Sequence, residues 1–201
     1  MNTETRKKII DLLMSTGRDG MMNLCAQMDM SEFFDAPCSG GNHLAKEGGL
    51  AEHSLNVYEM MHEAACCMPK ADIDLNSIII CALLHDLGKC GDYDKPGYVP
   101  NMIKDGRPTK TDPEQKYKQS ADKPFKTNPE LMYVPHEVRS IAITERFISL
   151  TEEEEFAILY HNGLYGDFRY AIQGKETPLY LLLHFADMWA SRVVEVEKQP
   201  E

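Results

Sequence analysis

The sequence predicts an all-α domain that carries one irregular or β-hairpin insertion. Apolar residues recur at helical spacing over most of the 201 residues. Helix-capping residues, glycines and prolines separate these apolar segments. Residues 91–135 break the pattern, because they are rich in proline and show no helical stripe. The length predicts a single domain over residues 1–201, in which 91–135 is an insertion between helices and not a linker.

Helices are expected at residues 4–15, 19–30, 50–68, about 77–88, 135–149, 152–161 and 178–198. Pro37 and four glycines predict a loop over residues 35–49. Pro69 should end the third helix, and Asp74 or Asn76 can cap the fourth, which should end near Gly88.

The C-terminal helices have clearer boundary signals. Pro135 suits the first position of a helix. Thr151 and Glu154 fit a capping box. Thr177 can cap the last helix, with Pro178 in its first turn. Inside the insertion, PFKTNPELMYV could form a strand or a hairpin.

The composition excludes several classes of partner. The formal net charge is −11, which disfavours a binder of duplex nucleic acid or of an anionic membrane surface. The six cysteines form no CxxC pair and are expected to be reduced thiols. The charged start of the chain lacks an apolar export segment, so a cytoplasmic location is expected.

Histidine and aspartate recur within the predicted apolar helices, at His53, His85, Asp86, His136, His161 and Asp187. Each alone would be expected to be a satisfied core residue. Together they suggest a cation, because unpaired carboxylates in apolar helices are costly. Imidazole and carboxylate suit Mn, Fe, Ni or Zn. His85 and Asp86 project about 100° apart on a helix, so they could meet at one ion while Asp86 reaches a second.

The order of these residues, with Lys89 three residues after the His85–Asp86 pair, resembles the HD-domain superfamily of metal-dependent phosphohydrolases. The similarity lies closest to the stand-alone bacterial HD hydrolases. The matching stretches are GGLAEHS, LLHDLGK, PHEVRSIAI, LYHNG and FADMWAS, which span about residues 48–192.

The resemblance implies an HD-domain helical bundle with the site at its centre. It implies a first metal held by four residues, namely His53, His85, Asp86 and Asp187. Asp86 would bridge to a second metal held by His136 and His161. Lys89 would meet the substrate phosphate, and Asp86 and Lys89 are thus the expected catalytic residues. The nucleophile would be a metal-bound hydroxide. One or two divalent ions are expected, among Fe, Mn, Ni, Co, Zn and Mg.

Several residues have competing interpretations. Lys89 could simply be a cation near a helix C-terminus. His43, in the glycine-rich loop, could touch substrate or be an exposed loop residue. Arg139 could contact an anionic substrate, although a surface arginine is the favoured interpretation. His184 lies one turn before Asp187 and could support the site, although a core or surface histidine is favoured.

The insertion carries positive charge within an acidic chain. Residues 104–127 have a net charge of +3. Both ends of the insertion adjoin predicted ligands, so it is a candidate lid that attracts a phosphorylated substrate. The alternative is a solvated loop whose charge is incidental.

The favoured function is hydrolysis of a phosphate ester in a nucleotide or a similar small molecule. The alternatives are a di-iron oxygenase of the inositol-oxygenase type and a non-catalytic HD signalling module. The expected partner is therefore a small phosphorylated substrate, with no duplex nucleic acid and no membrane, and the oligomeric state stays open.

Overall fold

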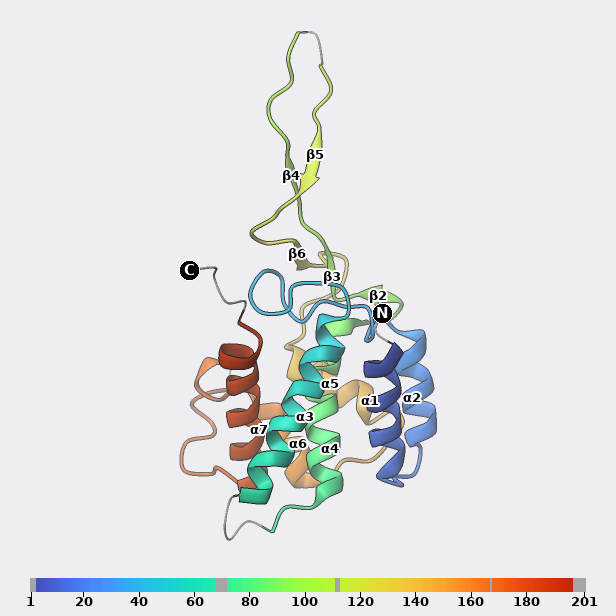
Figure 1. The fold of residues 1–201 in the computed structure, drawn as a ribbon, viewed down its shortest axis with the longest axis vertical. Helices are drawn as coiled ribbons and strands as arrows, with labels where there is room; N and C mark the ends of the chain where they lie inside the picture. Colours follow the sequence, from blue (N-terminus) through green and yellow to red (C-terminus); the bar gives the residue numbers. More distant parts are fainter. Residues whose placement is uncertain (1–2, 68–71, 111–112, 167, 197–201) are drawn as a thin grey trace.

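The computed structural model describes residues 3–67, 72–110, 113–166 and 168–196. It has seven α-helices within these ranges: α1 (Thr3–Ser15), α2 (Met21–Met30), α3 (Gly49–Cys67), α4 (Leu75–Leu84), α5 (His136–Thr144), α6 (Glu152–Tyr160) and α7 (Pro178–Trp189). Figure 1 shows α3 and α4 within the bundle, α1 and α2 on one flank, and α7 on the other. The predicted all-α architecture is confirmed.

Helix α4 is the apolar centre of the bundle. Its sequence, LNSIIICALL, is buried from Ser77 to Leu84, as expected of a helix surrounded by protein. The Asp74 side chain caps it by accepting a hydrogen bond from the Ser77 backbone N–H. Helix α4 packs against α1, α3, α6 and α7. Its last residue, Leu84, therefore delivers the His85–Asp86 pair to the middle of the molecule.

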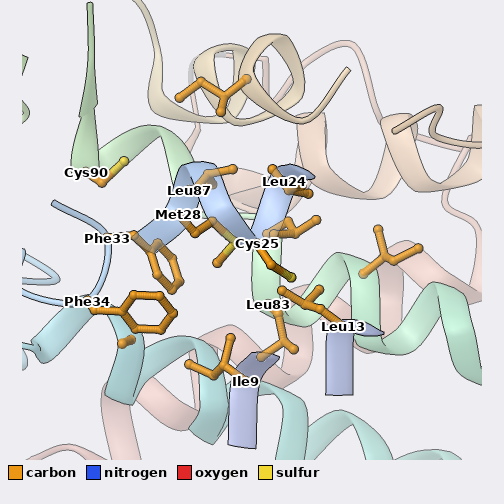
Figure 2. Packing of buried hydrophobic residues seen from close by; sticks show 14 of the residues in the cluster. Ile9, Leu13, Leu24, Cys25, Met28, Phe33, Phe34, Leu83, Leu87 and Cys90 are labelled. Carbon is orange, nitrogen blue, oxygen red and sulfur yellow. The ribbon is translucent and has the colours of Figure 1, made fainter. Parts of the chain in front are cut away.

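Two apolar clusters lie on either side of α4. The first includes Ile9, Leu13, Leu24, Met28, Phe33, Phe34, Leu83 and Leu87, several of which are seen in Figure 2. The second joins α3, α6 and α7 around Val57, Met61, Ile158, Leu182 and Leu183. Leu87 belongs to the first cluster and directly follows Asp86. Burial of this leucine thus anchors the turn that carries the pair.

Most predicted helix boundaries are close to the observed ones, and three differ. The fourth helix ends at Leu84, and a 3-10 helix, η1 (Leu87–Cys90), follows it. Helix α5 stops at Thr144 instead of 149. Helix α7 passes into a π-helix, η3 (Ala190–Val194), and the predicted end at Lys198 lies outside the described residues. The capping signals at Thr151 and Thr177 are confirmed.

The insertion forms short antiparallel strands. These are β1 (Gly91–Asp92), β2 (Lys95–Pro96), β3 (Tyr98–Pro100), β4 (Met102–Lys104), β5 (Tyr117–Gln119) and β6 (Phe125–Thr127). They pair as β1 with β2, β3 with β6, and β4 with β5. The predicted strand in PFKTNPELMYV is confirmed as β6, but its partner β3 is more than twenty residues away. Figure 1 shows the β4–β5 ribbon projecting from one end of the bundle.

No helix in the described ranges combines the length and the apolar character needed to cross a membrane.

Candidate metal centre

Five separate parts of the chain bring the six predicted ligands together. His53 lies on α3, His85 and Asp86 form the turn after α4, and His136 is the first residue of α5. The remaining two are His161, which directly follows α6, and Asp187, which lies on α7. The histidines at 53, 85 and 161 and Asp86 are almost fully buried. His136 and Asp187 are partly exposed, so the group opens to solvent on their side.

The carboxylate of Asp86 lies between two pairs of imidazoles. Its Oδ2 is 3.6 Å from His53 Nε2 and 3.4 Å from His85 Nε2. Its Oδ1 is 3.1 Å from His136 Nε2 and 3.5 Å from His161 Nε2. Each oxygen of one side chain therefore faces a different histidine pair. This is the arrangement that a carboxylate bridging two cations requires.

Asp187 closes the group from α7. Its Oδ1 lies 3.2 Å from His53 Nε2. It also forms a set with His85 and His161 whose ligand atoms lie within 4.8 Å of one another. A second such set contains His53, His85 and Asp86, and a third contains Asp86, His136 and His161. The sets share members, so they form one continuous centre.

Two of the histidines are oriented by the ends of their own helices. His85 Nδ1 donates to the Ala82 carbonyl oxygen at 2.9 Å. His161 Nδ1 donates to the Ile158 carbonyl oxygen at 2.7 Å. The last carbonyls of a helix lack intrahelical partners, and these rings satisfy them. A carbonyl oxygen only accepts, so Nδ1 carries the proton and Nε2 is left to face the centre.

A carboxylate accepts a hydrogen bond from the first of the other two rings, and a carboxylate lies beside the second. His53 Nδ1 lies 2.9 Å from Glu195 Oε1, and His136 Nδ1 lies 3.1 Å from Glu137 Oε2. Both carboxylates are buried. Neither was predicted from the sequence, because acidic residues in VVEVE and PHEVR look like ordinary solvated charges. A partner for each ligating imidazole is nevertheless typical of metal sites.

The centre contains polar atoms that the protein itself leaves unsatisfied. Within the described residues, His53 Nε2, His85 Nε2 and Asp86 Oδ1 are buried without a hydrogen-bond partner. Leaving such atoms unpaired is costly. A divalent cation would satisfy all three, and mixed nitrogen and oxygen donors suit Mn, Fe, Co, Ni or Zn. The residues present therefore fit a divalent metal.

The electrostatic environment favours the ligand forms of two of these groups. Burial lowers the pKa of His85, which keeps its imidazole neutral. Burial opposes ionisation of Asp86, but its polar neighbours, foremost the positive charge of Lys89, hold the pKa of this carboxyl well below its usual range. Asp86 is therefore ionised and His85 is neutral at neutral pH, as metal ligation requires.

Lys89 and Arg139 border a cavity of about 630 Å³ beside the centre. The cavity is also lined by His136, so it reaches a predicted ligand. Lys89 Nζ donates to Asp86 Oδ2 at 2.6 Å. The favoured interpretation of Arg139 as a surface residue is wrong, since it is only 6% exposed. The Met132 carbonyl oxygen, 2.8 Å from its Nη2, supplies a partner that the sequence does not reveal.

His43 and His184 both contact residues of the centre. His43 Nδ1 is bonded to Glu195, and the ring does not line the cavity beside Lys89. A contact between His43 and substrate therefore stays a prediction. His184 Nδ1 donates to the His161 carbonyl oxygen at 2.7 Å, so it supports the backbone of a predicted ligand. A Cβ on Gly163 would lie 2.5 Å from the His184 ring, which explains the glycine in LYHNG.

The basic segment of the insertion has two parts. Strands β4 and β5 are exposed along their length and project away from the helices (Figure 1). On this ribbon Lys118 pairs with Asp105 at 3.0 Å. The root of the segment, around Lys123 and Lys126, adjoins the Gly40–Gly41 loop. The ribbon does not cover the cavity in this arrangement, and its role as a lid stays a prediction.

One comparison with known proteins identifies a family. The family model described as the HD domain matches residues 50–167. The match includes five of the six predicted ligands, whereas Asp187 lies beyond it. The chain matches no curated protein and no solved structure. Since the family model covers more than half of the sequence, the chain belongs to the HD-domain family.

Proposed function

We propose that this protein is a metal-dependent phosphohydrolase that acts on a phosphate ester of a nucleotide or a similar small molecule. The observation that carries the proposal is the position of Asp86, whose two oxygens face two different pairs of imidazoles. Two adjacent cation positions suit in-line displacement at phosphorus. Membership of the HD-domain family supports the same chemistry.

The ligands divide between the two positions. His53, His85 and Asp187 would hold one ion with Asp86 Oδ2, and His136 and His161 would hold the other with Asp86 Oδ1. Ions bound there would lower the pKa of a water molecule and polarise a phosphoryl oxygen. The buried histidine–carbonyl hydrogen bonds keep the Nε2 atoms in place, so little reorganisation is needed during the reaction.

The adjoining cavity supports a small substrate. A volume of about 630 Å³ lies within the usual range for small-molecule sites. Tyr98 and Tyr133 are among the residues that line it, and tyrosine rings suit contact with a base or another flat group. Lys89 lies where the cavity meets Asp86. Its ammonium group would bind the phosphate that is cleaved.

Phosphate release and metal content test the proposal together. Purified protein is stripped with a chelator, reloaded separately with Mn, Fe, Co, Ni, Zn or Mg, and assayed against nucleotides, cyclic nucleotides and a generic phosphodiester. We expect metal-dependent phosphoryl hydrolysis with at least one substrate class. Oxygen consumption by the iron-loaded protein, without hydrolysis of any of these substrates, would favour the oxygenase alternative and contradict the proposal.

Matched variants make the test specific. Asp86→Ala removes the bridge and should abolish both metal binding and hydrolysis. Glu155→Gln also removes one carboxylate, but from an exposed position in the first turn of α6, and should change neither. Full metal occupancy in Asp86→Ala would overturn the assignment of the centre.

A further inference from the structure

We propose that Glu195 is a positioning residue for His53, and that His43 and Asn56 hold Glu195 in place for this task. The inference rests on the proposed metal centre. Glu195 Oε1 lies 2.9 Å from His53 Nδ1, and Oε2 lies 3.1 Å from the same nitrogen. An ionised carboxylate can accept hydrogen bonds but cannot donate them. The proton of this hydrogen bond must therefore lie on His53 Nδ1. His53 Nε2 is then free to face Asp86 and Asp187.

Among the buried histidines of the centre, His53 is the one whose Nδ1 bonds to a side chain and not to a backbone carbonyl. His85 and His161 donate to carbonyls of their own helices, which follow from backbone geometry. His53 lies within α3, where the carbonyls are already used by the helix. Its Nδ1 must therefore find an acceptor on another part of the chain. Glu195, from the other end of the sequence, is that acceptor.

The backbone after α7 is shaped to deliver Glu195. Residues Ala190–Val194 form one π-helical turn, and the Glu195 N–H donates to the Ala190 carbonyl oxygen at 3.0 Å. In a regular α-helix, residues 187 and 195 would point about 80° apart at about 100° per residue. A π-turn accommodates one extra residue and brings Glu195 back towards the face of Asp187. Both carboxylates can then reach the same imidazole.

Two further donors hold Glu195. The Asn56 amide donates to Oε1 at 3.0 Å, and it lies three residues after His53 on the same face of α3. His43 Nδ1 contacts Oε2 at 2.5 Å from the glycine-rich loop. The Glu195 side chain is almost completely buried. One carboxylate thus ties together α3, the loop and the end of α7, and it gives His43 a role without substrate contact.

Metal affinity tests the proposal through Glu195→Ala and Glu195→Gln. Chelator-stripped proteins are titrated with Mn²⁺ by calorimetry. Loss of a carboxylate that orients a ligating histidine costs about 10- to 100-fold in metal affinity, and we expect a loss of this size for Glu195→Ala. Glu195→Gln should lose less, since its amide oxygen can still accept from Nδ1–H. Glu155→Gln should bind as the wild type does. Unchanged affinity in Glu195→Ala would overturn the proposal.

A metal-free measurement separates this proposal from the proposed function. In protein labelled with ¹⁵N-histidine, we expect a slowly exchanging, downfield Nδ1–H proton that His53→Asn removes. Glu195→Ala should shift or abolish it, while circular dichroism shows a folded protein. If this result is found but wild-type protein binds no metal, Glu195 positions His53 and the proposed function is wrong. If Glu195→Ala keeps the resonance unchanged, the positioning role is wrong even in a protein that binds metal.

Discussion

Lys89 Nζ lies 2.6 Å from Asp86 Oδ2, the same oxygen that faces His53 and His85. The ammonium group is three residues after the aspartate, on the short 3-10 turn. It therefore balances the charge of the bridging carboxylate and also borders the cavity. This double contact joins the proposed metal centre to the proposed substrate site.

Replacing Lys89 should separate binding of metal from binding of phosphate. A hydrogen bond to a charged group contributes roughly 1.5–3 kcal/mol, so Lys89→Met should lower kcat/KM by about 10- to 100-fold. Metal content should be retained, because the six ligands are untouched. Lys7→Met, on the exposed surface of α1, is the matched control. A Lys89→Met protein with wild-type kcat/KM would contradict a phosphate-binding role.

Gly88 is required by the close approach of α5 to the turn. A Cβ there would lie 2.3 Å from the His136 carbonyl oxygen and 2.8 Å from the Ser140 backbone nitrogen. Backbone atoms cannot yield as a side chain can, so Gly88→Ala should destabilise the fold by about 3 kcal/mol. It should also weaken metal binding by displacing His136. Urea unfolding and Mn²⁺ titration measure the two effects.

Gly106→Ala is the control for this substitution. Gly106 has φ +69°, and no atom of the described residues lies within 4 Å of the position that an alanine methyl group would take. Alanine there therefore costs only the left-handed backbone, about 1 kcal/mol. Equal losses of stability at the two glycines would show that packing around Gly88 is looser than the structure indicates.

Arg18 is partly exposed and forms an ion pair with the buried Glu154 that supports α6. Arg18 Nη1 and Nη2 contact the two Glu154 oxygens at 2.9 and 2.8 Å, and Ser77 Oγ also donates to Glu154. Arg18→Met would leave a buried carboxylate without its partner. Breaking a buried pair in this way costs about 3–5 kcal/mol, and the partial exposure of Arg18 favours the lower end. Urea unfolding at pH 7 measures the loss.

The same pair predicts how stability depends on pH. Burial raises the pKa of Glu154, but the hydrogen bonds from Arg18, the Thr151 backbone N–H and Ser77 together outweigh burial, and the pKa lies below the ordinary value of 4.5. The stabilisation is therefore complete above pH 4.5 and is lost as the pH falls through the lower folded-state pKa. With chelator present, Glu154→Gln should lose less stability than the wild type between pH 5 and 3. Parallel pH curves would contradict the assignment.

The basic residues of the insertion fall into two groups, one near the cavity and one on the projecting β4–β5 ribbon. Charges separated by more than about 8–10 Å are largely screened at physiological salt. Lys123 and Lys126 lie at the root, next to cavity-lining Thr127, whereas Lys118 lies on the projecting strand β5. Lys123→Glu with Lys126→Glu should raise KM for an anionic substrate, and Lys118→Glu should not. If KM is unchanged in the double variant, the lid hypothesis is wrong.

The sequence predicts the helical framework because its signals are local. Thr151 and Glu154 form the predicted capping box, and Asp74 caps α4 as expected. The six candidate ligands also come together. Polar side chains on otherwise apolar helices are buried, and buried polar groups need polar partners. The features that the sequence does not predict depend on partners that are distant along the chain. Buried Arg139 has its partners in the Met132 carbonyl oxygen and the Asp92 carboxylate, which lies 3.7 Å from its Nη1. Strand β6 has its partner in β3.

Glu195 shows most clearly why part of the site does not follow from the sequence. Its partner His53 is 142 residues away in the sequence. Its direction also depends on a π-turn at residues 190–194, for which the sequence SRVVEVE offers no local signal. Only the packing of α7 against α3 brings the two residues together.

Anomalous diffraction from crystals grown with Mn²⁺ tests the central claim most directly. We predict peaks at bonding distance from Asp86 oxygens, one beside His53, His85 and Asp187 and one beside His136 and His161. Manganese peaks at other sites with none at Asp86, or no peak at all in a fully folded protein, would contradict the account.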